Sequence, residues 1–240
     1  MRCRFDELFE DQGFIRDAEG FERLLFARPT ISNLHLPRQL QRLCYRHIIL
    51  APQIWYLNKE GFDYETWFRQ GDALMTAYRD FCPWTSADLR TLFQPKAEVQ
   101  KLIDERTAAF SAHSIGVHIR RTDHQQAIDE SPLELFIEAI DSDLELHEDL
   151  TIYLATDDEA TKDTLRQRYG SRLITSKAEA TRSNSDGIRE ALVEMYALSR
   201  TSHIYGSAGS TFSPIAACLG DIPITILQRD GQGAVDLLCT

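Results

Sequence analysis

The second half of the chain alternates short apolar runs with amphipathic segments, and this alternation limits the folds open to it. Five runs have the composition of buried strands, and each of the first four precedes a segment of helical periodicity; they span residues 115–119, 151–155, 172–175, 203–205 and 222–227. Strands that alternate with helices pair in parallel, with the helices packed on the sheet. We therefore predict an α/β domain over residues 112–240, a Rossmann-like parallel sheet with helices on both faces.

Local signals place the helix that follows the first strand. Ser131 offers a capping hydroxyl, Pro132 suits the first helical position, and Glu134 lies at the spacing of a capping box. The sequence thus predicts a helix that Ser131 caps and that ends near Ile140.

Residues 1–111 lack this alternation. Apolar residues recur there at spacings of three and four, which is typical of amphipathic helices, and prolines interrupt the pattern. The expected helical segments cover residues 21–26, 34–50, 64–81 and 97–110. We predict a mainly helical N-terminal region over 1–111, followed by the α/β domain over 112–240.

The net charge of −11 is concentrated in the second half. Residues 1–111 hold 15 Lys and Arg against 16 Asp and Glu, whereas residues 112–240 hold 11 against 21. An acidic surface repels a nucleic-acid backbone, so a phosphate-bearing ligand must be held by a few local donors. The composition disfavours a nucleic-acid partner and favours a small ligand.

Composition also bears on the compartment and on metals. No apolar run approaches the roughly 20 residues that span a bilayer, and the first residues lack the apolar segment of a signal peptide. The five cysteines lie far apart and form no C-x-x-C pair, which argues against a disulfide framework and a structural zinc site. We expect a cytoplasmic protein with no membrane span, reduced thiols and no bound metal.

The end of the first strand is unusually polar, and in an open parallel sheet ligands bind beyond the carboxyl ends of the strands. This strand runs through His118 into Arg120 and Arg121, and strand alternation sends His118 and Arg120 to the same side. Guanidinium groups match phosphate oxygens in geometry and charge. The alternative is a structural ion pair between an arginine and Asp123.

Two further polar segments follow strands. Asp157 and Asp158 come after the second strand, where they either contact a ligand or cap the next helix. Ser210, Thr211 and Phe212 follow the fourth strand in a small-residue turn whose amides and hydroxyls suit a phosphate, although a tight connection alone explains such a turn equally well. Together with the arginines they predict a site for a nucleotide or nucleotide sugar. The missing glycine-rich fingerprint disfavours NAD and FAD.

Three strings resemble, in order, the signature motifs of the GDP-fucose-dependent fucosyltransferases, in particular the α-1,6- and nodulation fucosyltransferases. They are I-G-V-H-I-R-R-T-D at 115–123, I-Y-L-A-T-D-D at 152–158, and S-T-F-S at 210–213 with two alanines at 216–217. The match covers roughly residues 112–228. It implies a GT-B-like arrangement and a metal-independent, inverting transfer of fucose from GDP-fucose to a glycan hydroxyl.

The resemblance also implies roles for individual residues. Arg120 matches the arginine that holds the donor pyrophosphate and stabilises the leaving group, with His118 as a donor contact and Arg121 supporting the loop. Glu194 matches an acidic residue that reads the guanine edge. Phosphate, ribose or guanine contacts are implied for the other two motifs, at Ser210, Thr211, Phe212, Asp157 and Asp158.

The chain departs from the family pattern in two places. The family's glutamate after the first motif corresponds to Ile128, so the general base is shifted by one or two positions, supplied elsewhere or missing. Asp129 and Glu130 are the candidate bases, and the alternative for them is a solvated loop or cap. Family members open with a strand and a loop that closes over the donor, and this chain starts past that element. We therefore expect a shortened acceptor-side domain, and a catalytically inactive GDP-sugar-binding or interaction module is the alternative to an active transferase.

Overall fold

The computed structural model describes residues 3–13, 18–26, 36–77, 80–122, 125–178, 181, 183–229 and 231–233. The chain forms two compact units: a larger one of Met1–Ile15 and Trp84–Thr240, and a smaller one of Arg16–Pro83. Helix α6 (Ala97–Thr107) belongs to the larger unit because it packs against α10 (Ser185–Leu198). The division therefore differs from the boundary expected after residue 111.

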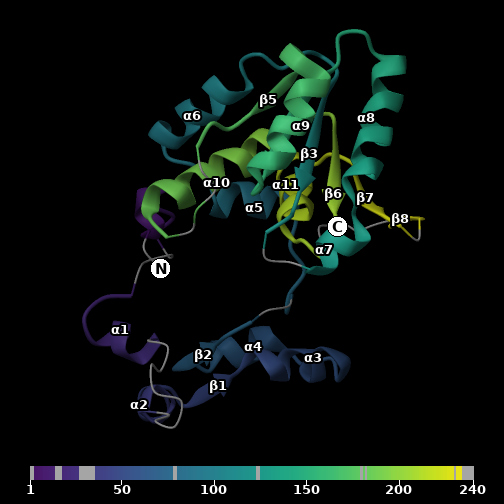
Figure 1. The fold of residues 1–240 in the computed structure, drawn as a ribbon. Coiled ribbons are helices and arrows are strands. Elements are labelled where there is room, and N and C mark those ends of the chain that lie inside the picture. Colours follow the sequence, from purple (N-terminus) through teal and green to yellow (C-terminus); the bar gives the residue numbers. More distant parts are fainter. Residues whose placement is uncertain are drawn as a thin grey trace. The chain divides into compact units, whose positions relative to one another are not determined.

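The larger unit is built on a six-stranded sheet in the order β5-β4-β3-β6-β7-β8 (Figure 1). Its strands are β3 (Ser114–Ile119), β4 (Thr151–Thr156), β5 (Leu173–Thr175), β6 (His203–Ser207), β7 (Ile224–Gln228) and β8 (Gly231–Gly233). The first five are parallel, which confirms the predicted strands, and β8 is antiparallel to β7. The sequence did not predict β8 because its three residues carry no apolar pattern.

Helices cover both faces of this sheet, as predicted (Figure 1). Side chains alternate along each strand, so that Val117 and Leu154 pack with α8 and α9, whereas Tyr153 and Ala155 pack with α10 and α11. These helices are α8 (Leu133–Leu146), α9 (Glu159–Tyr169), α10 and α11 (Phe212–Gly220). Shorter elements of the unit are η1 (Phe5–Glu7), α5 (Ser86–Leu92), α7 (Gln125–Glu130) and η2 (Gly170–Arg172).

The smaller unit contains helices and a two-stranded parallel sheet. Its elements are α1 (Phe21–Phe26), α2 (Leu36–Cys44), β1 (His47–Ile49), α3 (Ala51–Lys59), α4 (Tyr64–Arg69) and β2 (Ala73–Met75). Ile49, Ile54 and Tyr64 form its buried core. The two strands lie within the segments 34–50 and 64–81 that were expected to be helical. Three residues are too few for a period of two to be distinguished in the sequence.

Ser131 does not cap α8, contrary to the prediction. The helix has no side-chain cap, and it continues past Ile140 to its end at Leu146. The buried Ser131 hydroxyl instead donates to the Leu227 carbonyl at 2.6 Å and accepts from the Ala208 amide at 2.8 Å. It therefore ties the start of α8 to β7 and to the turn after β6.

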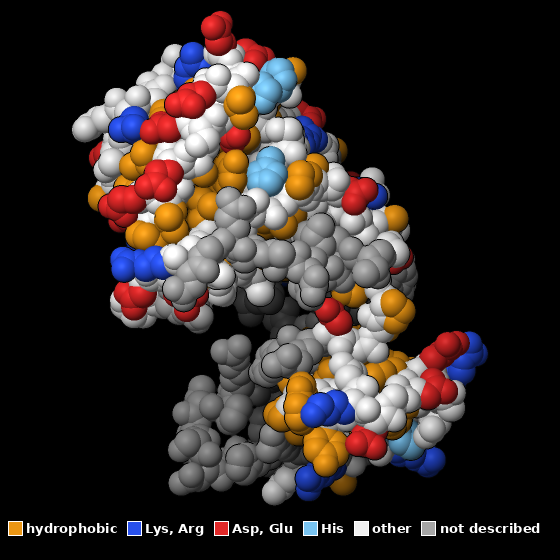
Figure 2. Space-filling model, turned by 90° about the vertical axis from the view of Figure 1, so that its right-hand side faces the viewer, with side chains coloured by type: hydrophobic (Ala, Val, Ile, Leu, Met, Phe, Trp, Pro, Cys, Tyr) orange, Lys and Arg blue, Asp and Glu red, His pale blue; other side chains and the backbone are white. Residues whose placement is uncertain are grey.

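The cysteines differ in their bonding state. Cys3, Cys44 and Cys82 have free thiols, whereas Cys218 is disulfide-bonded, so the expectation of reduced cysteines is wrong at that position. No helix among the described residues is long and apolar enough to cross a membrane. No group of three or more described His, Cys, Asp and Glu side chains could hold a metal ion. On the face of the larger unit seen in Figure 2, acidic side chains are spread among basic and apolar ones.

Ser131→Ala is expected to lower the free energy of unfolding by about 2 kcal/mol, because it removes the hydroxyl that bonds both the buried Ala208 amide and the Leu227 carbonyl. Urea unfolding followed by circular dichroism measures this loss. Ser142→Ala is the matched control, because that hydroxyl is exposed and bonds only to a carbonyl of its own helix; its effect should stay within about 0.5 kcal/mol. Equal losses in the two variants would contradict the bridging role of Ser131.

Candidate functional site

A cavity of about 410 Å³ lies where β3 and β4 end, between these strands, α10 and the start of α11. This is the edge at which the sequence predicts a ligand, because it is formed by the carboxyl ends of parallel strands. Five of the predicted binding residues line the cavity: His118, Arg120, Asp157, Glu194 and Phe212. All of the lining residues belong to the larger unit.

Asp157 organises the loop that follows β3. Its carboxylate accepts from the Arg121 amide at 2.8 Å and from the Thr122 hydroxyl at 2.6 Å, and the Nε of Arg120 lies 3.4 Å away. Asp157 is therefore an ion-pair partner of Arg120. The pair that the sequence offered as the alternative, with Asp123, lies outside the described residues. Arg121 contributes its backbone here, and its side chain does not line the cavity.

His118 presents a neutral ring to the cavity. The side chain is buried, and burial together with the neighbouring Arg120 charge lowers its pKa to about 4. Its Nδ1 lies 3.3 Å from the Ser213 hydroxyl, and its ring packs against Phe212 at 4.9 Å between centroids. At neutral pH the ring therefore offers a ligand an uncharged nitrogen rather than a second cation.

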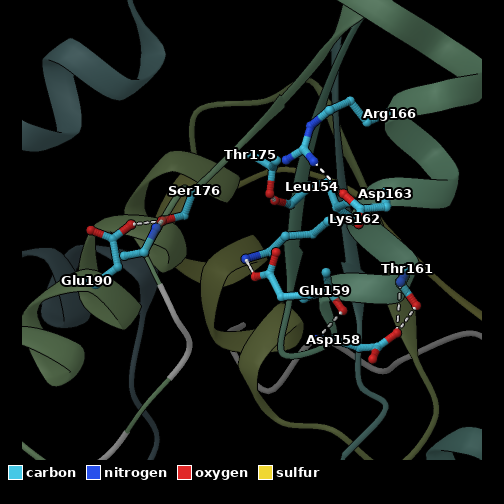
Figure 3. A network of polar contacts seen from close by, with 12 residues as sticks. Leu154, Asp158, Glu159, Thr161, Lys162, Asp163, Arg166, Thr175, Ser176 and Glu190 are labelled. Atoms are coloured by element: carbon cyan, nitrogen blue, oxygen red, sulfur yellow. Dashed lines mark hydrogen bonds and ion pairs between the residues drawn. The ribbon is translucent and has the colours of Figure 1, made fainter.

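Helix α10 contributes acidic side chains to the cavity, opposite in charge to Arg120. Gly187, Glu190 and Glu194 line the cavity and follow one another at spacings of three and four, so they share one side of the helix. Glu190 accepts hydrogen bonds from Arg106, at 2.7 Å, and from Ser176 (Figure 3). Its charge is thus already compensated.

Glu194 has no such partner. Within the described part of the chain its carboxyl makes no hydrogen bond or ion pair. Burial raises the pKa of Glu194 to about 7, and the nearby Glu190 carboxylate adds to this, while the charges of Lys162 and Arg106 oppose it. Glu194 is therefore a carboxyl group that faces the cavity and titrates near neutral pH.

Asp158 and Lys162 belong to α9 and not to the cavity lining. Asp158 caps the helix: its carboxylate accepts from the Thr161 amide at 2.8 Å and hydroxyl at 2.6 Å, which lowers its pKa (Figure 3). Of the two alternatives that the sequence left open for Asp158, capping is the one seen. Lys162 is buried, and its Nζ lies 2.6 Å from a Glu159 oxygen.

The third motif reaches the cavity through one residue. Phe212, the first residue of α11, lines it, whereas Ser210 and Thr211 lie in the preceding turn and do not. The Ser210 hydroxyl accepts from the Phe212 amide at 3.4 Å. Buried Ser213 is the motif's link to His118.

The candidate bases lie on the short helix α7, and neither lines the cavity. Asp129 is exposed and accepts a hydrogen bond from Gln125 at 2.9 Å, while Glu130 is partly buried. The structure thus brings five of the nine predicted donor-binding residues together at the cavity and leaves Arg121, Asp158, Ser210, Thr211 and both candidate bases outside its lining.

Several lining residues were not predicted. Glu190 precedes Glu194 by one helical turn, a spacing that could have singled it out. Its bond to Arg106 connects residues 84 apart in sequence and had no local signal. Gly187 allows Thr181 to approach α10, because a Cβ there would meet the Thr181 carbonyl oxygen at 2.1 Å.

Comparison with known proteins bears on the fold. No family model and no curated protein matches the sequence. Among solved structures, the chain is similar to the NodZ α-1,6-fucosyltransferase soaked with GDP-fucose, with a TM-score of 0.54 and 20% identity over 76% of this chain. Selenomethionine NodZ from Bradyrhizobium has a TM-score of 0.54 and 19% identity over 76% of this chain. POFUT1 in complex with GDP has a TM-score of 0.50 and 10% identity over 92% of this chain. The fold is that of fucosyltransferases.

The chain is shorter than these neighbours. It spans 64% and 63% of the two NodZ chains and 83% of the POFUT1 chain. The shared fold includes the parallel sheet at whose edge the cavity lies, which agrees with the arrangement implied by the three motifs.

Glu194→Gln should stabilise the protein at high pH. The carboxyl must give up its proton inside the fold at a pKa of about 7 instead of near 4.5, so the native protein loses stability as the pH rises between these values. Since one pKa unit corresponds to about 1.4 kcal/mol, and the group is partly exposed, we expect the variant to be more stable by roughly 2 kcal/mol at pH 8 and equal to the parent protein near pH 4.5.

Thermal unfolding at both pH values measures the difference. Glu138→Gln, on α8 and outside the cavity, is the control and should show no such dependence. A constant offset between the Glu194 variant and the parent protein across this range would contradict the raised pKa.

Proposed function

We propose that the cavity binds GDP-fucose and that the chain transfers the fucosyl group to a glycan hydroxyl by a metal-independent, inverting mechanism. The observation that carries this proposal is that one cavity joins a guanidinium, Arg120, to a carboxyl without a partner, Glu194. A nucleoside diphosphate has matching ends, an anionic diphosphate and a base with hydrogen-bond donors. Two of the neighbours of the same fold were solved with GDP-fucose or GDP.

The carboxyl end of the cavity suits guanine. The base carries N1–H and an amino group on one edge, and a single carboxylate accepts from both. Glu190 is engaged by Arg106 and Ser176, which leaves Glu194 as the acceptor on α10. Uracil lacks the paired donors, so we expect GDP to be preferred over UDP.

The arginine end suits the diphosphate. When the bond between sugar and phosphate breaks, negative charge develops on the departing diphosphate, and a preorganised guanidinium stabilises that charge. Arg120 is held beside the β3 loop by Asp157, so the arginine needs little reorganisation. His118 and Phe212, which line the cavity, complete the proposed diphosphate contacts, with Asp157 beside the ribose. Ser210 and Thr211, in the turn before α11, are assigned to the diphosphate by the motif resemblance alone.

The proposal also names candidates for the general base on the acceptor side. Asp129 and Glu130 are our candidates for the base that activates the acceptor hydroxyl, and their helix follows the Arg120 loop by a few residues. If neither acts as a base, a GDP-sugar-binding module without turnover is the remaining function. Release of GDP from GDP-fucose in the presence of a glycan distinguishes the two, and titration calorimetry with GDP, GDP-fucose and UDP tests the donor site separately.

Arg120→Ala is expected to weaken binding of GDP at least about 30-fold, since charge-assisted hydrogen bonds are worth roughly 1.5–3 kcal/mol each. The fold should persist, because Asp157 keeps its bonds to Arg121 and Thr122. Calorimetric titration measures the affinity and thermal unfolding checks the fold.

Arg166→Ala is the matched control, because that arginine pairs with Asp163 on the exposed side of α9 (Figure 3). It should leave GDP binding unchanged. Unaltered GDP affinity in the Arg120 variant would refute the proposed diphosphate site.

Binding of GDP-fucose should strengthen with pH. A carboxylate accepts from guanine only when ionised, and with a pKa of about 7 the ionised fraction of Glu194 rises about tenfold between pH 6 and pH 8. The diphosphate of GDP-fucose does not titrate in this range, so the dissociation constant reports on the protein. Calorimetry should show about tenfold tighter binding at pH 8, and Glu194→Gln should bind weakly with no such trend. A flat profile in the parent protein would rule out this role of Glu194.

A further inference from the structure

The smaller unit has a cavity of its own, of about 490 Å³, between the end of α2 and the start of α3. Its lining combines the guanidinium groups of Arg42 and Arg46 with the polar side chains of Gln41, Tyr45 and Gln53. All of these residues belong to one unit, so the cavity is independent of the site at the sheet edge.

Among the described residues, no partner compensates the two positive charges in this cavity. Among the Lys and Arg side chains that the structure describes in the smaller unit, Lys59 lies over an indole ring at 4.1 Å and Arg69 pairs with Glu65 at 2.6 Å. Arg42 and Arg46 make no hydrogen bond or ion pair with any described residue, and no carboxylate lines the cavity. The two described cations without a partner are thus the two that share this cavity.

The polar groups around them favour a ligand that also carries hydroxyls. Gln41 donates through its amide nitrogen to the Leu25 carbonyl at 2.6 Å, which leaves its oxygen as an acceptor. Gln53 accepts from the Leu50 amide at 2.8 Å, which leaves its nitrogen as a donor. The cavity is also much larger than a single oxyanion, so the anion would be one group of a larger molecule.

We propose that this cavity binds the anionic group of an acidic sugar, with Arg42 and Arg46 on its oxyanion. A phosphate ester, a sulfate ester and a carboxylate share the required chemistry, since the arginine fork matches paired anionic oxygens. Both arginines are exposed, and the competing explanation is that Arg42 merely complements the carbonyl end of α2 while Arg46 is only solvated. That explanation predicts no selective binding.

Calorimetric titration of the full chain with glucose 6-phosphate, glucose 6-sulfate, glucuronate and glucose tests the proposal and identifies the anion. We expect at least one acidic sugar to bind about tenfold or more tightly than glucose, and Arg42→Gln and Arg46→Gln each to weaken that binding about tenfold. Arg42→Lys should restore part of it, because lysine keeps the charge but lacks the fork.

Two controls make the outcome decisive. Arg69→Gln removes a paired arginine of the same unit and should leave the affinity unchanged. Arg120→Ala removes the cation of the other cavity and should also leave it unchanged, so failure of the proposed donor site does not affect this result. The proposal is overturned if no acidic sugar binds better than glucose, or if Arg69→Gln or Arg120→Ala weakens binding as much as the Arg42 and Arg46 variants.

Discussion

The cavity at the sheet edge depends on the pairing register of two neighbouring strands. β3 and β4 are aligned so that Ile119 lies beside Thr156, and the next residues, Arg120 and Asp157, therefore meet where the strands end. The Asp157 carboxylate accepts hydrogen bonds from the Arg121 amide and the Thr122 hydroxyl in the loop after β3, and it pairs with the Arg120 side chain. On the other side, Ser207 of β6 accepts from the Arg120 amide at 3.1 Å. The arginine is thus fixed by the sheet itself, and a slip of one residue would remove it from the site.

Two carboxyl groups of α10, those of Glu190 and Glu194, line the same cavity as Arg120, where an anion is proposed to bind. Two carboxylates one turn apart on the same face repel each other, and burial adds a desolvation cost. Arg106 offsets the charge of Glu190. Glu194 has no such partner among the described residues, so burial and the Glu190 charge raise its pKa to about 7. Buried Lys162 acts in the opposite direction. A carboxyl that is costly to ionise gains most from contact with the N–H donors of a ligand.

The sequence was most informative where the periodicity is long or the residues follow a strand. The five parallel strands and the positions of His118, Arg120 and Asp157 follow from short apolar runs and from the rule that ligands bind at their carboxyl ends. Glu194 came from the family resemblance, because by itself it reads as one acidic residue on an amphipathic helix. The Ser131 bridge and the Glu190–Arg106 pair were not predictable, since each joins segments that only tertiary packing brings together.

The distribution of charge bears on how the two proposed anion sites would select a ligand. Residues 16–83 carry nine Lys and Arg against eight Asp and Glu, and the rest of the chain carries 17 against 29. At physiological ionic strength fields are screened beyond about 8 Å, so neither the weak positive balance of one unit nor the acidic surface of the other decides what enters a cavity. In the two proposed sites, direct contact with Arg120 in one and with Arg42 and Arg46 in the other would decide it. A surface that repels polyanions is therefore compatible with cavities that take small anionic ligands.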